Sequence, residues 1–119
     1  MNKNKTGYVI PHTHWDREWR YPLWENRMYL RDLMEELMDT LEQNEDYKSF
    51  LLDGQVVAAL DYLEVCPESR VRLEKLIRDG RIQIGPWYTL PDLYPISGES
   101  MIRNLLKGKE KAEELGGYL

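Results

Sequence analysis

Cysteine is almost absent from the sequence: Cys66 is the only one, so no disulfide can form within the chain and a reducing compartment is expected. Long hydrophobic runs are also missing, and the polar residues 1–5 lead into the chain without the apolar core of a secretory signal. We therefore expect a cytoplasmic protein that does not enter a membrane. Cys66 lies beside Pro67 and near neither histidine, so we expect an inert thiol at a helix break.

Charge of one sign does not dominate either. The chain has 16 basic and 21 acidic residues, a formal net charge of -5, and the two signs are interleaved. Such a pattern offers no surface to a polyanion, so nucleic acid is not an expected partner. Hydrophobic residues make up 42% of the 119 positions, which is enough to bury a core. No repeat or low-complexity linker divides the chain, so we predict that residues 1–119 belong to one domain.

Three short apolar segments have the character of buried strands: residues 8–12, 49–53 and 81–85. A helical pattern follows each of them. After the first strand, apolar residues recur at three- and four-residue intervals from Met28 to Leu41, with acidic and basic residues between them. This alternation of strand and helix predicts an α/β fold with parallel strands and right-handed crossovers.

The later helices are marked by their breaks and caps. Pro67 ends the helix that begins near Val56 and opens another, which stops at Gly80. Ser97 is placed to cap the last helix, whose apolar residues we expect to face the core. These residues are Ile102, Leu105, Leu106, Ala112 and Leu115.

Parallel strands end at one edge of their sheet, where α/β proteins place their sites. We therefore expect residues 12–19, 53–55 and 87–92, which follow the three strands, to converge. The first segment contains both histidines. In it, the imidazole of His14 and the carboxylate of Asp16 have the spacing at which both can reach one zinc ion from an extended backbone. On this spacing alone, ordinary loop residues, with Asp16 capping the next helix, are an equal alternative.

A longer pattern favours the metal site. Residues 11–19, Pro-His-Thr-His-Trp-Asp-Arg-Glu-Trp, resemble the opening of the family 38 α-mannosidases. Residues 51–55, Leu-Leu-Asp-Gly-Gln, and residues 84–92, Ile-Gly-Pro-Trp-Tyr-Thr-Leu-Pro-Asp, are similar to the bacterial branch of that family. The three segments come in the expected order, and the resemblance covers essentially the whole chain.

The resemblance implies a retaining α-mannosidase, a glycoside hydrolase that removes terminal α-linked mannose. Its catalytic domain would be an irregular seven-stranded α/β barrel, of which this chain is the N-terminal portion. One Zn²⁺ ion would hold the 2- and 3-hydroxyls of the mannose. His14 and Asp16 match two of the zinc ligands, and Trp19 matches the aromatic wall of the subsite where the bond is cleaved, whereas His12 matches a histidine that is not a ligand.

Trp19, Asp53 and Asp92 are the candidate substrate-binding residues. An indole packs well against the apolar faces of a sugar ring, although aromatic residues usually bury and Trp15 and Trp24 are close in the sequence. We favour Trp19 as the one that faces the sugar. Asp53 and Asp92 either line the site or cap the segments that follow them.

Retaining hydrolysis needs two carboxyl groups about 5 Å apart. In the family that this chain resembles, both lie further along, so we expect no catalytic residue among residues 1–119 and no activity from this chain alone. The substrate of the whole protein would be an α-mannoside oligosaccharide. A barrel cut at this point leaves an open sheet edge, which predicts a homo-oligomer or association with the rest of the polypeptide.

Two other functions fit parts of the pattern. A metal-dependent amidohydrolase-like hydrolase would use His12 and His14 as ligands of a metal that activates water, but this leaves Asp16 and Trp19 unexplained. A non-catalytic carbohydrate-binding module could be built on the same fold. An aspartate-bearing strand following in a longer sequence would favour the mannosidase over the module.

Overall fold

Helix α1 is the longest element and runs from Leu23 to Gln43 in a computed structural model that describes residues 5–117. Its buried residues recur at three- and four-residue spacing and form one face of the helix. These residues are Leu30, Met34, Leu37, Met38 and Leu41. The helix begins directly after Pro22, five residues before Met28, the first residue of the predicted amphipathic pattern. The sequence pattern does not show that the helix begins before Met28, because Trp24 is apolar but exposed and so interrupts the amphipathic pattern.

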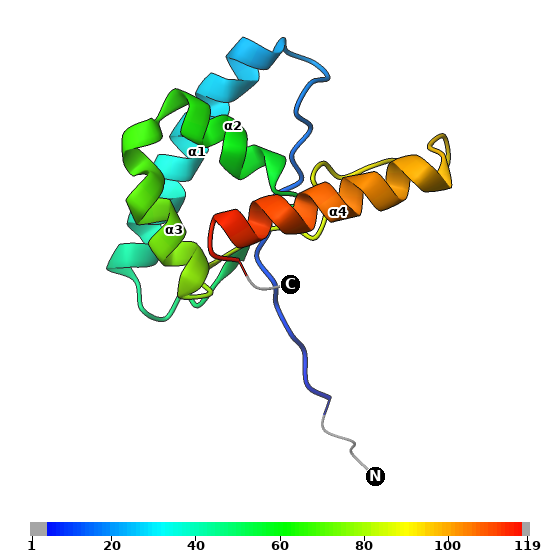
Figure 1. Cartoon of the computed structure of the whole chain (residues 1–119). Coiled ribbons are helices and arrows are strands. Elements are labelled where there is room, and N and C mark those ends of the chain that lie inside the picture. The colour runs from blue at the N-terminus through cyan, green and yellow to red at the C-terminus, as the bar shows by residue number, and fades with distance from the viewer. Residues whose placement is uncertain (1–4, 118–119) are drawn as a thin grey trace.

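Within residues 5–117 the elements follow the order α1, β1, α2, η1, α3, β2 and α4 (Figure 1). Strand β1 is Phe50–Leu51, helix α2 is Val57–Val65, the 3-10 helix η1 is Pro67–Ser69, α3 is Arg70–Arg78, β2 is Ile82–Gln83 and α4 is Gly98–Glu114. Pro67 separates α2 from α3, as predicted. The prediction that Ser97 caps α4 is also confirmed, because its hydroxyl accepts a hydrogen bond from the Ser100 amide at 3.1 Å.

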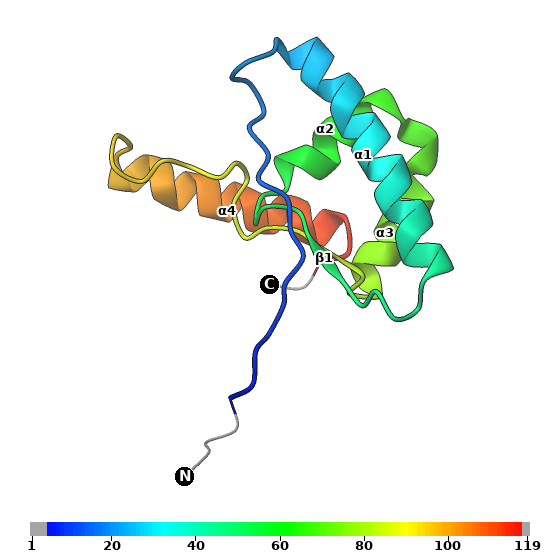
Figure 2. The ribbon, with the colours of Figure 1, turned by 180° about the vertical axis from the view of Figure 1, so that it is seen from behind.

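Strands β1 and β2 are parallel, with Phe50 opposite Ile82 and Leu51 opposite Gln83. The predicted strand over residues 8–12 is wrong in its extent, because it contributes a single parallel bridge between His12 and Leu51. Its first residues are exposed, Tyr8 by 87% and Val9 by 94%, and Figure 2 shows this segment extending away from the helices. In this register residues 8–10 would pair with residues 47–49, which belong to the connection between α1 and β1.

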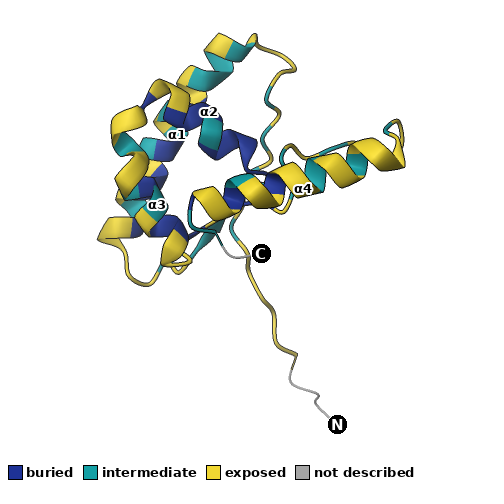
Figure 3. Cartoon of the chain, in the orientation of Figure 1, coloured by how far each residue is buried: buried dark blue, intermediate teal, exposed yellow. Residues whose placement is uncertain are grey.

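The core lies where α1, α2 and α3 meet the two strands, and Figure 3 shows the buried residues on the faces of these helices that point toward one another. Tyr62 is the largest fully buried side chain. Cys66 ends α2 in this core, where burial raises the pKa of its thiol, as expected for an unreactive cysteine. None of the helices in residues 5–117 is long and apolar enough to cross a membrane.

Helix α4 packs through its second half only. Gly108, Ala112 and the following Leu115 are buried, whereas Ile102 and Leu106 are 55% and 64% exposed, so the prediction that these two face the core is wrong. Figure 1 shows the reason: the first half of α4 extends beyond the other helices, beside the loop that precedes it.

Candidate functional site

The three segments predicted to converge do lie together. The Thr13 amide donates to the Leu51 carbonyl at 3.2 Å, which joins the first segment to the end of β1. The Trp87 amide donates to the Gly54 carbonyl at 3.1 Å, and the Val56 amide donates to the Trp87 carbonyl at 2.9 Å, which joins the second segment to the third. Parallel strand ends therefore bring residues 12–19, 53–55 and 87–92 to one place, as the α/β pattern predicted.

His14 lies between two carboxylates in this region. Its Nε2 is 3.7 Å from Oδ1 of Asp16, and its Nδ1 is 3.5 Å from Oδ1 of Asp53. The side chains of His14 and Asp16 are exposed, whereas that of Asp53 is only 9% exposed. The structure thus places the two predicted metal ligands side by side and adds Asp53 on the opposite edge of the imidazole.

The donor atoms of His14 and Asp16 suit a zinc ion. In tetrahedral coordination with bonds of about 2.0–2.2 Å, two ligand atoms are about 3.4 Å apart, close to the 3.7 Å observed between Nε2 and Oδ1. Within residues 5–117 no group of three or more histidine, cysteine, aspartate or glutamate side chains is arranged to hold a metal ion. The described residues therefore include the two predicted ligands, His14 and Asp16, and a zinc site at this place would need others.

Asp53 is held by hydrogen bonds rather than capping helix α2. Its Oδ2 accepts from the Trp15 amide at 2.8 Å and from Nε2 of Gln55 at 3.1 Å. Its backbone has a φ of 48°, a left-handed conformation that is uncommon outside glycine and that Gly54 continues with a φ of 67°. This sharp turn directs the carboxylate of Asp53 back toward Trp15 and His14.

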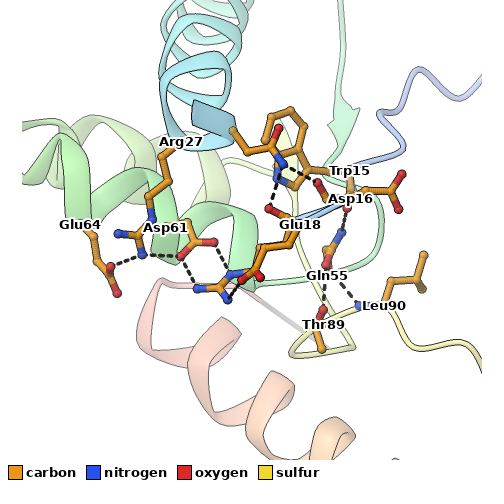
Figure 4. A network of polar contacts seen from close by, with 11 residues as sticks. Trp15, Asp16, Glu18, Arg27, Gln55, Asp61, Glu64, Thr89 and Leu90 are labelled. Atoms are coloured by element: carbon orange, nitrogen blue, oxygen red, sulfur yellow. Dashed lines mark hydrogen bonds and ion pairs between the residues drawn. The ribbon is translucent and has the colours of Figure 1, made fainter. Parts of the chain in front are cut away.

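Arg17, next to the predicted metal ligand Asp16, is anchored on helix α2 by Asp61, which Figure 4 labels. Its Nε and Nη2 donate to the two carboxylate oxygens of Asp61 at 2.6 and 3.1 Å, and Nη2 of Arg27 donates to Oδ1 at 2.9 Å. The Asp61 side chain is 3% exposed. Its hydrogen bond to Arg17 raises the pKa of that guanidinium.

Asn26 of helix α1 holds the same segment from the other side. Its Nδ2 donates to the carbonyl of Arg17 at 3.0 Å and to that of Asp16 at 3.3 Å. Sequence reasoning missed both Asn26 and Asp61. For Asp61 there was a signal, since it is the one charged residue in the apolar stretch from Val56 to Leu63.

The remaining candidates lie apart from the pair His14 and Asp16. Trp19 is 72% exposed, with the guanidinium of Arg20 located 4.8 Å from its ring centroid. Asp92 is exposed and accepts a hydrogen bond from the Tyr94 amide at 3.1 Å, the local turn that the capping alternative describes. Nδ1 of His12 is 2.8 Å from the carbonyl oxygen of Thr13. The structure therefore brings His14, Asp16 and Asp53 together and leaves the roles of Trp19 and Asp92 as predictions.

A cavity of about 540 Å³ opens beside this cluster. Among its lining residues are His12, Asp53 and Trp87, and its walls are otherwise mainly apolar. A cavity with apolar and aromatic walls and few polar groups is typical of a small-ligand site.

Comparisons with known proteins identify the family of this chain. Residues 5–117 match the N-terminal domain of the glycosyl hydrolases of family 38. A protein of Halalkalibacterium halodurans described as a "Putative mannosylglycerate hydrolase" is 43% identical over 112 residues, which cover 94% of this chain and 12% of that protein.

Two solved structures from Enterococcus faecalis have the same fold. An alpha-mannosidase superposes with a TM-score of 0.88 at 39% identity over 92% of this chain, and a protein of glycosyl hydrolase family 38 gives 0.84 at 36% identity over 94%. The chain spans 12% and 13% of their lengths. Since the family match includes nearly every residue, among them those around His14 and Asp16, the chain belongs to glycosyl hydrolase family 38.

Proposed function

We propose that this chain is the first part of the catalytic domain of a retaining α-mannosidase that binds its sugar through a zinc ion. The observation that carries the proposal is the placement of His14 Nε2 and Asp16 Oδ1 3.7 Å apart, where residues 12–19, 53–55 and 87–92 converge. Two relatives, one named alpha-mannosidase and one described as a mannosylglycerate hydrolase, support an α-mannoside as substrate. Family 38 membership favours this activity over an amidohydrolase-like one that would use His12.

His14 and Asp16 would hold the zinc ion in this proposal. The ion would supply a positively charged centre for two hydroxyl groups of the mannose. The neighbours of Asp16 would orient the zinc ion. Asp61 binds the side chain of Arg17, and Asp53 binds the amide of Trp15. The residues on both sides of Asp16 are therefore held in place. Trp19, which is largely exposed, would stack against the apolar face of the sugar.

The nucleophile and the acid/base residue of the reaction would lie outside the described residues, in later strands of an α/β barrel. Strand β2 supports such a continuation, since within residues 5–117 it pairs on one side only, with β1. A cavity of about 350 Å³ lies at this place and is lined in part by Ile82, Ile84 and Gly117. A further strand beside β2 would cover this cavity. That strand would come from the rest of the polypeptide or from a second copy of the chain in a homo-oligomer. We also propose a cytoplasmic protein, because a chain with one cysteine has no internal disulfide of the kind that oxidising compartments favour.

Zinc titration of the chain, followed by NMR, tests the metal assignment. We expect the ring signals of His14 to shift on titration, and the variants His14→Ala and Asp16→Ala to weaken binding by more than about 100-fold, because each removes a ligand rather than an outer partner. Trp19→Ala is the matched control and should bind zinc as the parent does, since stacking and coordination are separate contributions. Equal zinc binding by the parent and His14→Ala would contradict the proposal.

A further inference from the structure

Gln55 is the most completely bonded buried side chain near the candidate metal site. It is 2% exposed and lies at the turn between β1 and α2. A buried amide must satisfy two donor hydrogens and one acceptor oxygen, because an unpaired buried polar atom loses the hydrogen bonds that it would make with water. The side chain of Gln55 meets that requirement entirely with atoms from the three convergent segments.

The donor end of Gln55 binds the segment that carries His14 and Asp16. Its Nε2 donates to the Trp15 carbonyl at 2.7 Å and to Oδ2 of Asp53 at 3.1 Å. Because Oδ2 of Asp53 also accepts from the Trp15 amide, the two side chains together bind both backbone polar groups of Trp15. Trp15 is the residue between the two proposed ligands, so its position sets theirs.

The acceptor end of Gln55 binds the third segment. Its Oε1 accepts from the Leu90 amide at 3.2 Å and from the Thr89 hydroxyl at 3.4 Å, as Figure 4 shows. The Thr89 backbone is in turn bound on both sides by Asn104 of α4, whose Oδ1 accepts from the Thr89 amide at 3.0 Å and whose Nδ2 donates to the Thr89 carbonyl at 2.7 Å. One buried amide therefore connects the proposed metal ligands to the loop of residues 87–92.

We propose that Gln55 is a positioning residue that couples the segment of His14 and Asp16 to the loop of residues 87–92 through the two ends of its amide. The importance of this coupling for metal binding rests on the proposed function, whereas the coupling itself does not. Rotation or loss of the amide would break its bonds to the Trp15 carbonyl and the Leu90 amide together, since no other side chain is bonded to both segments within residues 5–117. Asp53 would remain the side-chain partner of the Trp15 amide.

Two substitutions separate the two ends of the amide. Gln55→Glu keeps an oxygen for the Leu90 amide but replaces the donor with a second oxygen, which faces the Trp15 carbonyl and the Asp53 carboxylate. Gln55→Met has nearly the same length and removes both ends. Gln83→Glu, the same change at an exposed position of β2, is the matched control.

Amide hydrogen exchange, followed by NMR on the full chain, measures the exchange rates at Trp15 and at Leu90 separately. We expect Gln55→Glu to accelerate exchange at Trp15 by at least about tenfold with little change at Leu90, and Gln55→Met to accelerate both. Gln83→Glu should alter neither. If a variant fails to fold, as judged from the amides of α1 and α3, Gln55→Asn takes its place and should accelerate both. Unchanged exchange at Trp15 in Gln55→Glu would overturn the coupling.

Zinc titration then decides whether the coupling positions the metal ligands. Gln55→Glu should lower zinc affinity by about 10–100-fold, the usual effect of losing an outer-shell partner, while Gln83→Glu leaves it unchanged. Accelerated exchange at Trp15 with parental zinc affinity would overturn the positioning role. If the parent chain bound no zinc at any concentration, not even weakly through His14 and Asp16, the proposed metal site would fail. The exchange measurements would still decide whether Gln55 couples the two segments.

Discussion

Asp61 shows how a single buried charge can hold a functional segment. Its carboxylate accepts three hydrogen bonds from Arg17 and Arg27, and Arg17 immediately follows the proposed ligand Asp16. The bidentate contact with the Arg17 guanidinium fixes direction as well as distance. A buried charge of this kind adds little stability compared with an apolar residue of equal size, yet removing one partner is costly, because the other charges lose their compensation.

We expect Asp61→Asn to destabilise the fold by about 2–3 kcal/mol. This is less than the ~3–5 kcal/mol typical of breaking a fully buried pair, because Arg17 and Arg27 keep part of their access to solvent. Urea unfolding measures the change. Asp32→Asn is the control, since Asp32 pairs with Arg31 at an exposed position and should have little effect. A loss no larger than that of the control would show that Asp61 does not anchor Arg17.

Sequence reasoning can bring together residues that carry a pattern of their own. His14 and Asp16 were predicted as metal ligands from their spacing together with the family resemblance. The structure places the two side chains next to each other, and their role as ligands stays a prediction. Gln55 and Asn26 could not be predicted as anchors, because a side-chain amide bonds to backbone atoms whose positions depend on the tertiary fold. The same holds for Asp53, whose contact with His14 is made across 39 residues of sequence.

At the scale of elements, helix α4 meets the loop of residues 86–88 without any side chain between them. A methyl group added to Gly108 would be 2.2 Å from the Pro86 carbonyl oxygen and 2.4 Å from backbone atoms of Trp87 and Tyr88. These are backbone atoms, which cannot rotate away as the end of a flexible side chain can. The absence of a side chain at Gly108 therefore sets how closely α4 approaches the loop.

We predict that Gly108→Ala destabilises the protein by about 1–3 kcal/mol, the usual cost of forcing extra atoms into a packed contact. Helix propensity alone would give the opposite sign, since alanine stabilises a helix relative to glycine by up to about 1 kcal/mol. Gly98→Ala is the matched control: its added methyl group meets nothing within 4 Å, so the change should be neutral or stabilising. Thermal unfolding of both variants measures the difference, and equal melting temperatures would refute the close contact.

Helices were predicted better than strands, and the reason is physical. In α1 and α3 the buried residues are three or four positions apart, a spacing that the sequence shows directly. Pro67 and Ser97 mark helix boundaries because a proline breaks a helix and a serine hydroxyl caps one. The strand predicted over residues 8–12 needs a partner, and its apolar composition could not reveal that residues 47–49 opposite it belong to a connection. The exposure of Ile102 and Leu106 likewise depends on how far α4 extends beyond the other helices. The spacing of apolar residues cannot predict that distance.

At the scale of the whole molecule, apolar side chains are exposed in several places within residues 5–117, and two of these places bear on association. One is the N-terminal segment, with Tyr8, Val9 and Ile10. The other lies around the loop before α4 and the first half of that helix, with Tyr94 and Leu106. Together with the side of β2 that pairs with no strand within residues 5–117, these surfaces favour an interface, because exposed apolar side chains and open strand edges promote association.

We therefore expect the 119-residue chain to self-associate in solution, with an average mass that exceeds one chain and rises with protein concentration. Ile10→Glu should reduce this association, since it places a charge in the exposed apolar segment without touching the core formed by α1, α2 and α3. Light scattering over a concentration series measures both. Arg103→Glu, a charge change at an exposed position of α4, tests whether added negative charge alone lowers the mass. A parent chain that stays monomeric at every concentration would show that residues 5–117 form a closed domain. It would also contradict the inference that a further strand pairs with β2.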